Sequence, residues 1–395
     1  MVSRRLILAF AFAAAPAIAG AASLDASIGQ RLFERNWVSA PSSTKSDDGL
    51  GPLYDAPSCA SCHAQRASAD LDETTVPPGV VVRLGNAKGT GDPVYGRQLQ
   101  TRAVAGQTPE ANPDITWMAK GDLRVAAITL YSQGYGPMAK DTKMALRRAP
   151  SPFGVGLLAQ IPESEILKLA ASGDANRDGV SGRPAWIVDK GRRVLGRFGW
   201  KATQPDLQAQ ISMAFSNDIG LSTEAHREPW GDCTPSERAC RQGPHGAEKG
   251  EVEVPPVLVN MIADYLASLP PPAPIQAAAG QAVFNRVGCA ACHATLHLAN
   301  GQAVGAYTDL LLHDMGPGLD DGIKEGAAEA GEWRTAPLWN VAAALRLGGL
   351  LHDARARNVA EAVKWHDGEA AAARSRFETL TPADKAALVD FVSRL

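Results

Sequence analysis

Two copies of a Cys-x-x-Cys-His motif stand far apart in the chain of 395 residues, at positions 59–63 and 289–293. This spacing is typical of covalent heme c attachment, in which two thiols bond to the vinyl groups of the porphyrin and the histidine binds the iron. The expected attachment residues are Cys59, Cys62, Cys289 and Cys292, with His63 and His293 as iron ligands. The alternatives are a zinc site or a chance disulfide. A zinc site would have to gather ligands from both motifs and would leave the repeated histidine unexplained. The sequence therefore predicts two heme c groups.

The ligand on the opposite side of each iron decides which chemistry a heme performs. Two strong axial ligands confine the iron to electron transfer, whereas an open or weakly held position admits a substrate such as peroxide. The candidates are the histidines outside the two motifs, together with methionine, tyrosine and lysine side chains. These histidines are His226, His245, His297, His313, His352 and His366. Composition alone does not choose among them, because a single histidine is more often structural than a ligand.

The two remaining cysteines, Cys233 and Cys240, lie close together in the sequence. In an oxidising compartment such a pair is expected to form a disulfide that closes a small loop. The alternatives are two free thiols or a catalytic dithiol, although the spacing differs from the Cys-x-x-Cys of redox motifs.

Residues 173–182 carry oxygen-bearing side chains at alternate positions, followed by a glycine turn. These side chains belong to Asp174, Asn176 and Asp178. The pattern resembles a calcium-binding loop, although Ala185 occupies the place of the closing glutamate and Asp189 is the available substitute. The alternative is a polar, glycine-rich turn that binds no cation.

Each Cys-x-x-Cys-His motif follows a segment with the same residues at the same offsets. Gly29 and Phe33 precede the first motif, and Gly280 and Phe284 precede the second. In a helix the phenylalanine would lie one turn beyond the glycine on the same face, and the glycine would permit close approach of another helix. The repeat suggests two cytochrome-like units, with chance similarity as the alternative.

A proline-rich segment, residues 270–274, follows a predicted helix over 258–269 and marks the expected domain boundary. We expect a first cytochrome c-like heme domain with insertions over 23–269 and a second over 275–395. Another helix is predicted at the C-terminus, with Thr381 as its N-cap. Because strand-like segments are scarce, the sequence predicts a mostly α fold, with two cytochrome c-like heme domains, long loops and an enlarged first domain.

Residues 1–22 have the layout of a secretory signal peptide, with Arg4 and Arg5, then an apolar run, then small residues. An uncleaved membrane anchor is the alternative, although the run is short and alanine-rich for a membrane span. We therefore expect an exported, periplasmic protein with no membrane contact after cleavage. The net charge of −3 and the lack of a basic tract make nucleic acid an unexpected partner.

Several blocks of the sequence resemble one family. The block Arg-Thr-Ala-Pro-Leu-Trp-Asn-Val at 334–341 and Leu-His-Asp at 351–353 resemble blocks of the bacterial di-heme cytochrome c peroxidases and the methylamine-utilisation di-heme enzymes. A narrower branch, the di-heme oxidoreductases often labelled thiol oxidoreductases, resembles further segments in both halves. These segments are 91–100, 157–163, 194–201, 307–316 and 364–370. The resemblance to the di-heme oxidoreductases extends over nearly the whole mature chain.

The resemblance implies a sixth ligand for the second heme. In the peroxidase-like enzymes this ligand lies on the helix after the His-Asp block, and here that region holds His366. Ligation by His293 and His366 would give a lower reduction potential than a His/Met pair. The alternative is a histidine on the helix surface.

For the first heme, the resemblance implies polar residues over an open face. Gln133 and Pro137 are similar to the Gln and Pro that the peroxidases place there, but the expected acid position falls near Lys143. A carboxylate that would act as an acid or base during O–O cleavage is then missing. Met138 or Met144 becomes a candidate sixth ligand, with core packing as the alternative.

The resemblance implies an oxidoreductase that is peroxidase-like. A small redox donor protein, such as a cytochrome or cupredoxin, would reduce the second heme, and electrons would pass to a substrate at the first heme. The alternative is a pure electron-transfer protein with both hemes six-coordinate. A thiol oxidase is a third possibility, for which only the Cys233–Cys240 pair is available. Trp117, Trp333 and Trp339 are candidates to lie between the hemes, with core packing as the alternative.

Overall fold

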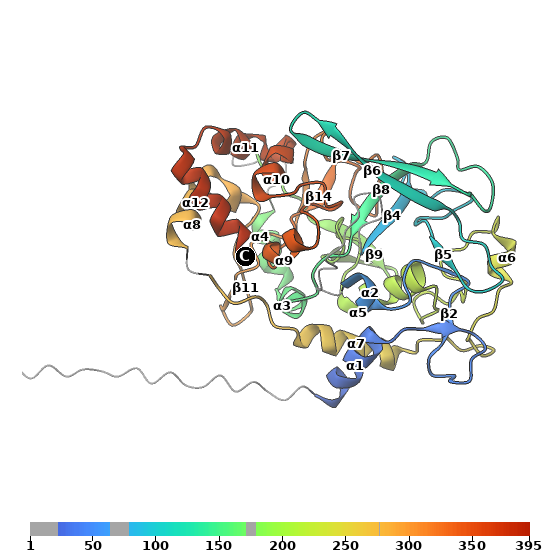
Figure 1. Cartoon of the computed structure of the whole chain (residues 1–395). Helices are drawn as coiled ribbons and strands as arrows, with labels where there is room; N and C mark the ends of the chain where they lie inside the picture. Colours follow the sequence, from blue (N-terminus) through green and yellow to red (C-terminus); the bar gives the residue numbers. More distant parts are fainter. Residues whose placement is uncertain (1–22, 64–78, 171–178, 276) are drawn as a thin grey trace, which may run out of the picture.

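The computed structural model describes residues 23–63, 79–170, 179–275 and 277–395 (Figure 1). The expectation of a mostly α fold is wrong, because the structure is 31% helical and 20% strand, with several small sheets. The strands pair two by two, and most of them, β1 to β10, lie between residues 38 and 196, within the expected first domain.

One helix pair stands beside the first Cys-x-x-Cys-His motif. Helix α1 (Leu24–Glu34), capped by Ser23, packs along α7 (Pro256–Ser268) (Figure 1). Gly29 of α1 lies so close to α7 that a side chain there would collide with the backbone carbonyl of Met261. This close approach holds two distant segments of the chain together.

A second helix pair repeats this arrangement beside the other motif. Helix α8 (Ala278–Val287) packs along α12 (Pro382–Ser393), and Gly280 lies against the backbone of Ala387 (Figure 1). In each half the helical phenylalanine contacts the motif histidine. The ring centroids are 6.0 Å apart for Phe33 and His63, and 6.3 Å apart for Phe284 and His293. The short repeat in the sequence thus corresponds to the same helix pair built twice.

The strands form hairpins and short ladders. Strand β6 (Asn112–Lys120) pairs antiparallel with β7 (Leu123–Tyr131) through a two-residue turn in which Gly121 has a φ of 66°. Strand β4 (Val80–Gly85) pairs with β8 (Lys143–Arg148), and β9 (Ala185–Asp189) pairs with β10 (Arg192–Gly196). The other strands are β1 (Val38–Ser39), β2 (Asp48–Leu50), β3 (Leu53–Tyr54), β5 (Arg102–Ala103), β11 (Leu296–His297), β12 (Ala303–Val304), β13 (Leu312–Asp314) and β14 (Glu332–Arg334).

Short helices complete the structure. They are α2 (Cys59–His63), α3 (Val155–Gln160), α4 (Glu163–Leu169), α5 (Leu207–Ala214), the π-helix η1 (Phe215–Ile219), α6 (Arg238–Arg241), the 3-10 helix η2 (Cys289–Ala291), α9 (Val341–Arg346), α10 (Val359–Trp365), the 3-10 helix η3 (Gly368–Ala370) and α11 (Ala371–Glu378). In the part of the chain that the structure describes, no helix is both long and apolar enough to cross a membrane.

The β6–β7 hairpin ties the first half of the chain to the second. Arg124 donates hydrogen bonds to the backbone carbonyls of Gly348, Ala354 and Arg355. At the hairpin turn, Asp122 forms an ion pair with Lys364, and Lys120 lies over the ring of Trp365. The hairpin therefore rests on the segment that leads to His366.

A disulfide joins Cys233 and Cys240 and closes a loop that contains a fully buried carboxyl group. This group, Glu237, faces the equally buried Glu110. A backbone N–H donates to each carboxyl at 2.6 Å, from Gln100 to Glu110 and from Thr234 to Glu237. The second oxygen of each is buried without a donor from the described residues. Burial raises the pKa of both groups, and the negative charge of Glu237 raises that of Glu110 further. The raised pKa favours the protonated form of Glu110, whose O–H would donate to Glu237.

The shared proton makes the stability of the fold depend on pH. Because the folded-state pKa of Glu110 is raised, this stabilisation is complete below the ordinary carboxyl pKa of about 4.3 and is lost as the pH rises through the raised value. We expect the free energy of unfolding to fall toward alkaline pH. The Glu110→Gln variant should lessen this fall, because its amide donates to Glu237 at every pH while the titration of Glu237 itself remains. Urea unfolding from about pH 5 to about pH 9 measures the free energy of unfolding of the parent and of the variant. Glu251→Gln, at an exposed site, is the control. An identical pH profile for Glu110→Gln and the parent would contradict the shared proton.

Candidate functional site

A continuous cavity of about 750 Å³ reaches both Cys-x-x-Cys-His motifs. Both cysteines and the histidine of each motif line it. Apolar side chains from the two helix pairs form much of the remaining wall, including Phe33, Ile262, Phe284 and Leu388. An apolar cavity that presents two thiols and an imidazole at each of two places fits two flat, apolar macrocycles that carry iron.

The motif cysteines are half-buried thiols with raised pKa values. Burial raises the pKa of the Cys59 and Cys62 thiols to about 12 and that of Cys289 to about 11. A reactive dithiol needs a lowered pKa, because the thiolate is the nucleophile. The four thiols are not joined in disulfides. These properties fit heme attachment better than thiol chemistry.

At the second motif, two imidazoles lie close together in the cavity wall. The ring centroids of His293 and His366 are 6.5 Å apart. Two imidazoles bound to opposite sides of one metal, each with a bond of about 2 Å, place their centroids about 6 Å apart. In each ring Nδ1 is held by a backbone carbonyl, that of Tyr307 at 2.9 Å and that of Ala362 at 2.6 Å, so Nε2 is left for a metal. Burial lowers the pKa of His293 to about 4 and also lowers that of His366, which keeps both rings neutral, as metal ligands must be.

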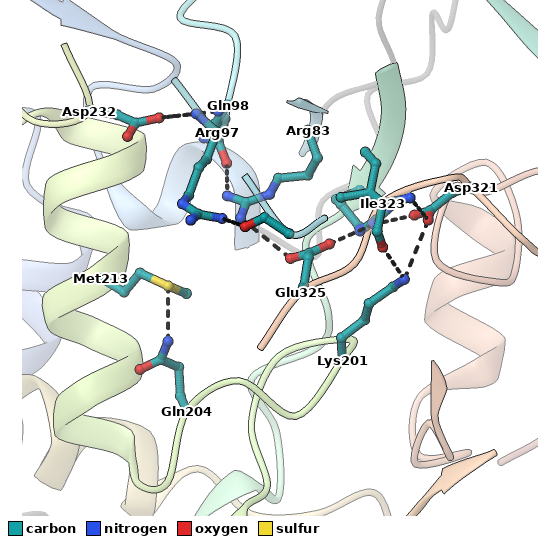
Figure 2. A network of polar contacts seen from close by, with 12 residues as sticks. Arg83, Arg97, Gln98, Lys201, Gln204, Met213, Asp232, Asp321, Ile323 and Glu325 are labelled. Atoms are coloured by element: carbon teal, nitrogen blue, oxygen red, sulfur yellow. Dashed lines mark hydrogen bonds and ion pairs between the residues drawn. The ribbon is translucent and has the colours of Figure 1, made fainter. Parts of the chain in front are cut away.

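The first motif has only half of this arrangement. The Nδ1 atom of His63 lies 2.9 Å from the carbonyl of Pro150, so its Nε2 is likewise left for a metal. Its aromatic contact is with Phe33, and no second imidazole among the described residues stacks near it. Helix α5 instead presents Met213 and Gln210 to the cavity. The Met213 sulfur accepts a hydrogen bond from Gln204 at 3.0 Å (Figure 2), and the Gln210 Oε1 atom is buried without a donor. The sequence analysis missed both, since a methionine and an amide on a short helix carry no motif.

The residues that the family resemblance suggested for the first heme do not line the cavity. Gln133, Pro137 and Lys143 are exposed in and after the β7–β8 connection. Met138 and Met144 pack against the β4–β8 core, and neither reaches the cavity wall. The β7–β8 connection follows the β6–β7 hairpin and does not reach the cavity wall. Spacing along the chain was therefore not enough to place Gln133 and Pro137 beside the first heme site.

Other predicted residues are placed as follows. Both ring nitrogens of His313 face carboxylates, Nε2 to Asp309 at 2.8 Å and Nδ1 to Glu369 at 2.7 Å. Although burial lowers it, hydrogen bonds with Asp309, Cys292 and Glu369 raise the pKa of His313 to about 12. Both ring nitrogens are engaged by these contacts in the described structure. Trp333 and Trp339 line the cavity, whereas Trp117 is a β6 residue that does not. The calcium-loop residues Asp174, Asn176 and Asp178, and the predicted signal peptide, lie outside the described residues.

A network of buried charges crosses one side of the cavity (Figure 2). Arg147 of β8 pairs with Asp321 and Glu325, and Arg83 of β4 also pairs with Glu325. The Lys201 side chain is fully buried and its Nζ atom lies 3.3 Å from Asp321. Although burial alone would raise it, Arg147 and Arg83 lower the pKa of Glu325 to about 2. The cations come from the first half and the carboxylates from the second, so the network joins the two halves beside the cavity.

The sequence profile of the family described as "Di-haem oxidoreductase, putative peroxidase" matches residues 135–395. The matched part contains the second Cys-x-x-Cys-His motif, His366 and the acidic side of the buried network. No curated protein matches the chain.

Proposed function

Because the chain belongs to the di-haem oxidoreductase family, we propose that it binds two heme c groups and passes electrons from the second heme to a substrate at the first. The family description implies two hemes, and the cavity offers two attachment sites, at Cys59–His63 and at Cys289–His293. The donors at each site are those that heme c requires.

The difference between the two sites carries the proposal. The centroids of the His293 and His366 rings are 6.5 Å apart, a separation that two imidazoles on one metal would have, whereas no second imidazole of the described residues lies near His63. A site closed by two imidazoles suits electron transfer, and a site with one imidazole leaves a position for a substrate. Bound at these sites, heme would accept and release single electrons and, where a coordination position is open, bind an oxidant such as peroxide.

The chain's own residues would then orient and tune the groups. The carbonyls of Pro150 and Tyr307 fix the motif histidines so that Nε2 points into the cavity. Gln210 also lines the cavity, and its Oε1 atom is enclosed by protein without a donor from the described residues. Lys143, which took the acid position in the sequence comparison, is exposed and away from the cavity, so the missing acid there does not bear on this site.

Met213 supports a second candidate function. Its thioether lines the cavity near the first motif, and a thioether is a natural sixth ligand of heme iron. If Met213 closes this site, both hemes are six-coordinate and the protein only carries electrons.

Low-temperature electron paramagnetic resonance of the oxidised and half-reduced holoprotein distinguishes the two functions. The enzyme predicts a high-spin ferric signal, in one of these states, that changes when peroxide is added. Low-spin signals from both hemes in both states, with no response to peroxide, would leave the electron carrier.

The proposal includes the setting of the protein. A signal peptide at residues 1–22 would deliver the chain to the periplasm, where heme c attachment and the Cys233–Cys240 disulfide are both compatible with the environment. A small redox protein, such as a cytochrome or cupredoxin, would supply the electrons. Calcium bound by Asp174, Asn176 and Asp178 remains part of this proposal.

A further inference from the structure

Two buried guanidinium groups in the cavity wall lack a negative partner. Arg148 is 9% exposed and Arg334 is 7% exposed, and both line the cavity. Neither forms an ion pair with a carboxylate of the described residues, in contrast to Arg147 beside them. Burial lowers the pKa of each to about 10, so both remain cations at neutral pH. Two positive charges therefore border an apolar cavity with no described carboxylate in an ion pair with either of them, although the charge of Asp309 acts on Arg334 from farther away. Such an arrangement is costly unless an anion enters the cavity.

The unused donors of these groups open onto the cavity. Arg148 donates through Nη1 to the carbonyls of Ala344 and Gly349. Arg334 donates through Nε to the carbonyl of Gly199 at 2.8 Å and through Nη1 to that of Thr335 at 3.4 Å. Their other N–H groups have no partner in the described structure, and they are not among the atoms that protein encloses. They are thus free to donate to a group inside the cavity.

A neutral histidine completes the same wall. His352 is 4% exposed, lines the cavity, and stacks on Trp333 with the ring centroids 3.7 Å apart. No described residue bonds to either ring nitrogen, and neither nitrogen is enclosed by protein. Burial, together with the charges of nearby arginines and a lysine, lowers the pKa of His352 well below its usual value, so the ring stays neutral. It therefore offers one N–H donor to the cavity.

Trp200 holds the three donors together. Its indole N–H donates to the backbone carbonyl of Arg148 at 2.7 Å, and its own backbone carbonyl accepts from the backbone N–H of Arg334 at 3.0 Å. The His352 carbonyl accepts from the Arg148 N–H at 2.7 Å. Arg148 and Trp200 belong to the first half of the chain, and Arg334 and His352 to the second. The donors therefore share one wall where the two halves meet.

We propose that Arg148, Arg334 and His352 form a carboxylate-binding wall that holds propionate groups of the bound hemes. Each heme brings two carboxylates on an otherwise apolar ring, which is the combination that unpaired guanidinium groups in an apolar cavity fit. This inference rests on the proposed two-heme function. A free carboxylate that binds beside the hemes has the same chemistry, and the test separates the two sources.

The test compares Arg148→Gln, Arg148→Lys and the parent as full-length holoproteins. Heme is first counted by mass and by pyridine hemochrome absorbance, because a chain without two covalent hemes fails the proposed function and not this inference. In Arg148→Gln we expect the propionate bending band in the resonance Raman spectrum to shift. The midpoint potential of one heme should fall, since a nearby cation disfavours the ferric state. Arg148→Lys should restore most of both values. Arg192→Gln, at an exposed site of β10, should change neither.

Three results would overturn the inference. The first is an unchanged propionate band and potential in both Arg148→Gln and Arg334→Gln, with two hemes present. The second is binding of added acetate to the parent that Arg148→Gln abolishes while the propionate band stays fixed, which would assign the wall to a free carboxylate. The third result concerns His352→Phe, which keeps an aromatic ring on Trp333. We expect this variant to shift the propionate band and nothing else. Loss of a low-spin signal would instead make His352 an iron ligand.

Discussion

Replacing His366 with alanine is expected to convert the second heme from low-spin to high-spin ferric iron while the heme stays attached. The reason is geometric, since His366 is the only described imidazole whose ring faces that of His293, at 6.5 Å. Covalent attachment through Cys289 and Cys292 does not depend on His366. Electron paramagnetic resonance of the oxidised holoprotein measures the change, and the heme count confirms that both groups remain.

The same position offers a graded test through the reduction potential. His366→Met exchanges an imidazole for a thioether, which favours ferrous iron, so the midpoint potential of the second heme should rise above that of the parent. His245→Ala removes an exposed histidine elsewhere and should leave both the spin state and the potential unchanged. A low-spin signal that persists in His366→Ala would show that another side chain closes the second site.

His366 also shows what the sequence could supply. The attachment motifs are local, and the block at 351–353 indicates a helix after it, so a candidate ligand position can be chosen along one short stretch of chain. The structure then needs only the N-cap of Asn358 and the seven residues of α10 to bring His366 to the cavity. Predictions of this kind depend on local geometry, which sequence patterns encode well.

The strands were harder to predict for a physical reason. Strand β7 has no clean alternation of buried and exposed residues, because it is half-buried along most of its length. Leu123 and Val125 pack against the second half of the chain, whereas Ala126, Ile128 and Leu130 pack against the first. The sequence of β7, Leu-Arg-Val-Ala-Ala-Ile-Thr-Leu-Tyr, therefore lacks the period of two that signals a strand. Missing this hairpin also misplaced Gln133 and Pro137, because the chain leaves the cavity along it.

The cavity-lining charges lay beyond sequence reasoning as well. Lys201 and Asp321 are separated by 120 positions, and neither belongs to a recognisable motif. Pairing of this kind arises only when the two halves of the chain meet. Arg148 and Arg334 are a similar case. Nothing in the sequence around either residue indicates that its guanidinium group forms no ion pair in the described structure.

Substitution of Lys201 by methionine should cause a large loss of stability. The Lys201 side chain is fully buried, and its ammonium group donates to the carbonyls of Ile323, Glu329 and Ala330 at 2.7, 3.0 and 2.9 Å as well as facing Asp321. Methionine has a similar length but no donor, so three carbonyls and one carboxylate lose a partner at once. Removing one member of a buried pair typically costs about 3 kcal/mol or more. Urea unfolding of the holoprotein measures the change in free energy.

A double variant tests whether the charge pair or the lost packing is responsible. In Lys201→Met, the buried Asp321 carboxylate keeps only Arg147 as a cationic partner. Adding Asp321→Asn to this variant removes that carboxylate. If charge imbalance contributes, the double variant should lose less stability than the sum of the two single variants, by about 1 kcal/mol. Lys140→Met, on the exposed β7–β8 connection, is the control and should change the free energy of unfolding little. Additive losses would assign the effect to the carbonyl contacts of Lys201 alone. The carbonyl groups that Lys201 contacts all lie between residues 323 and 330, in the second half of the chain. Either result therefore measures how much one buried lysine contributes to holding the two halves together beside the cavity.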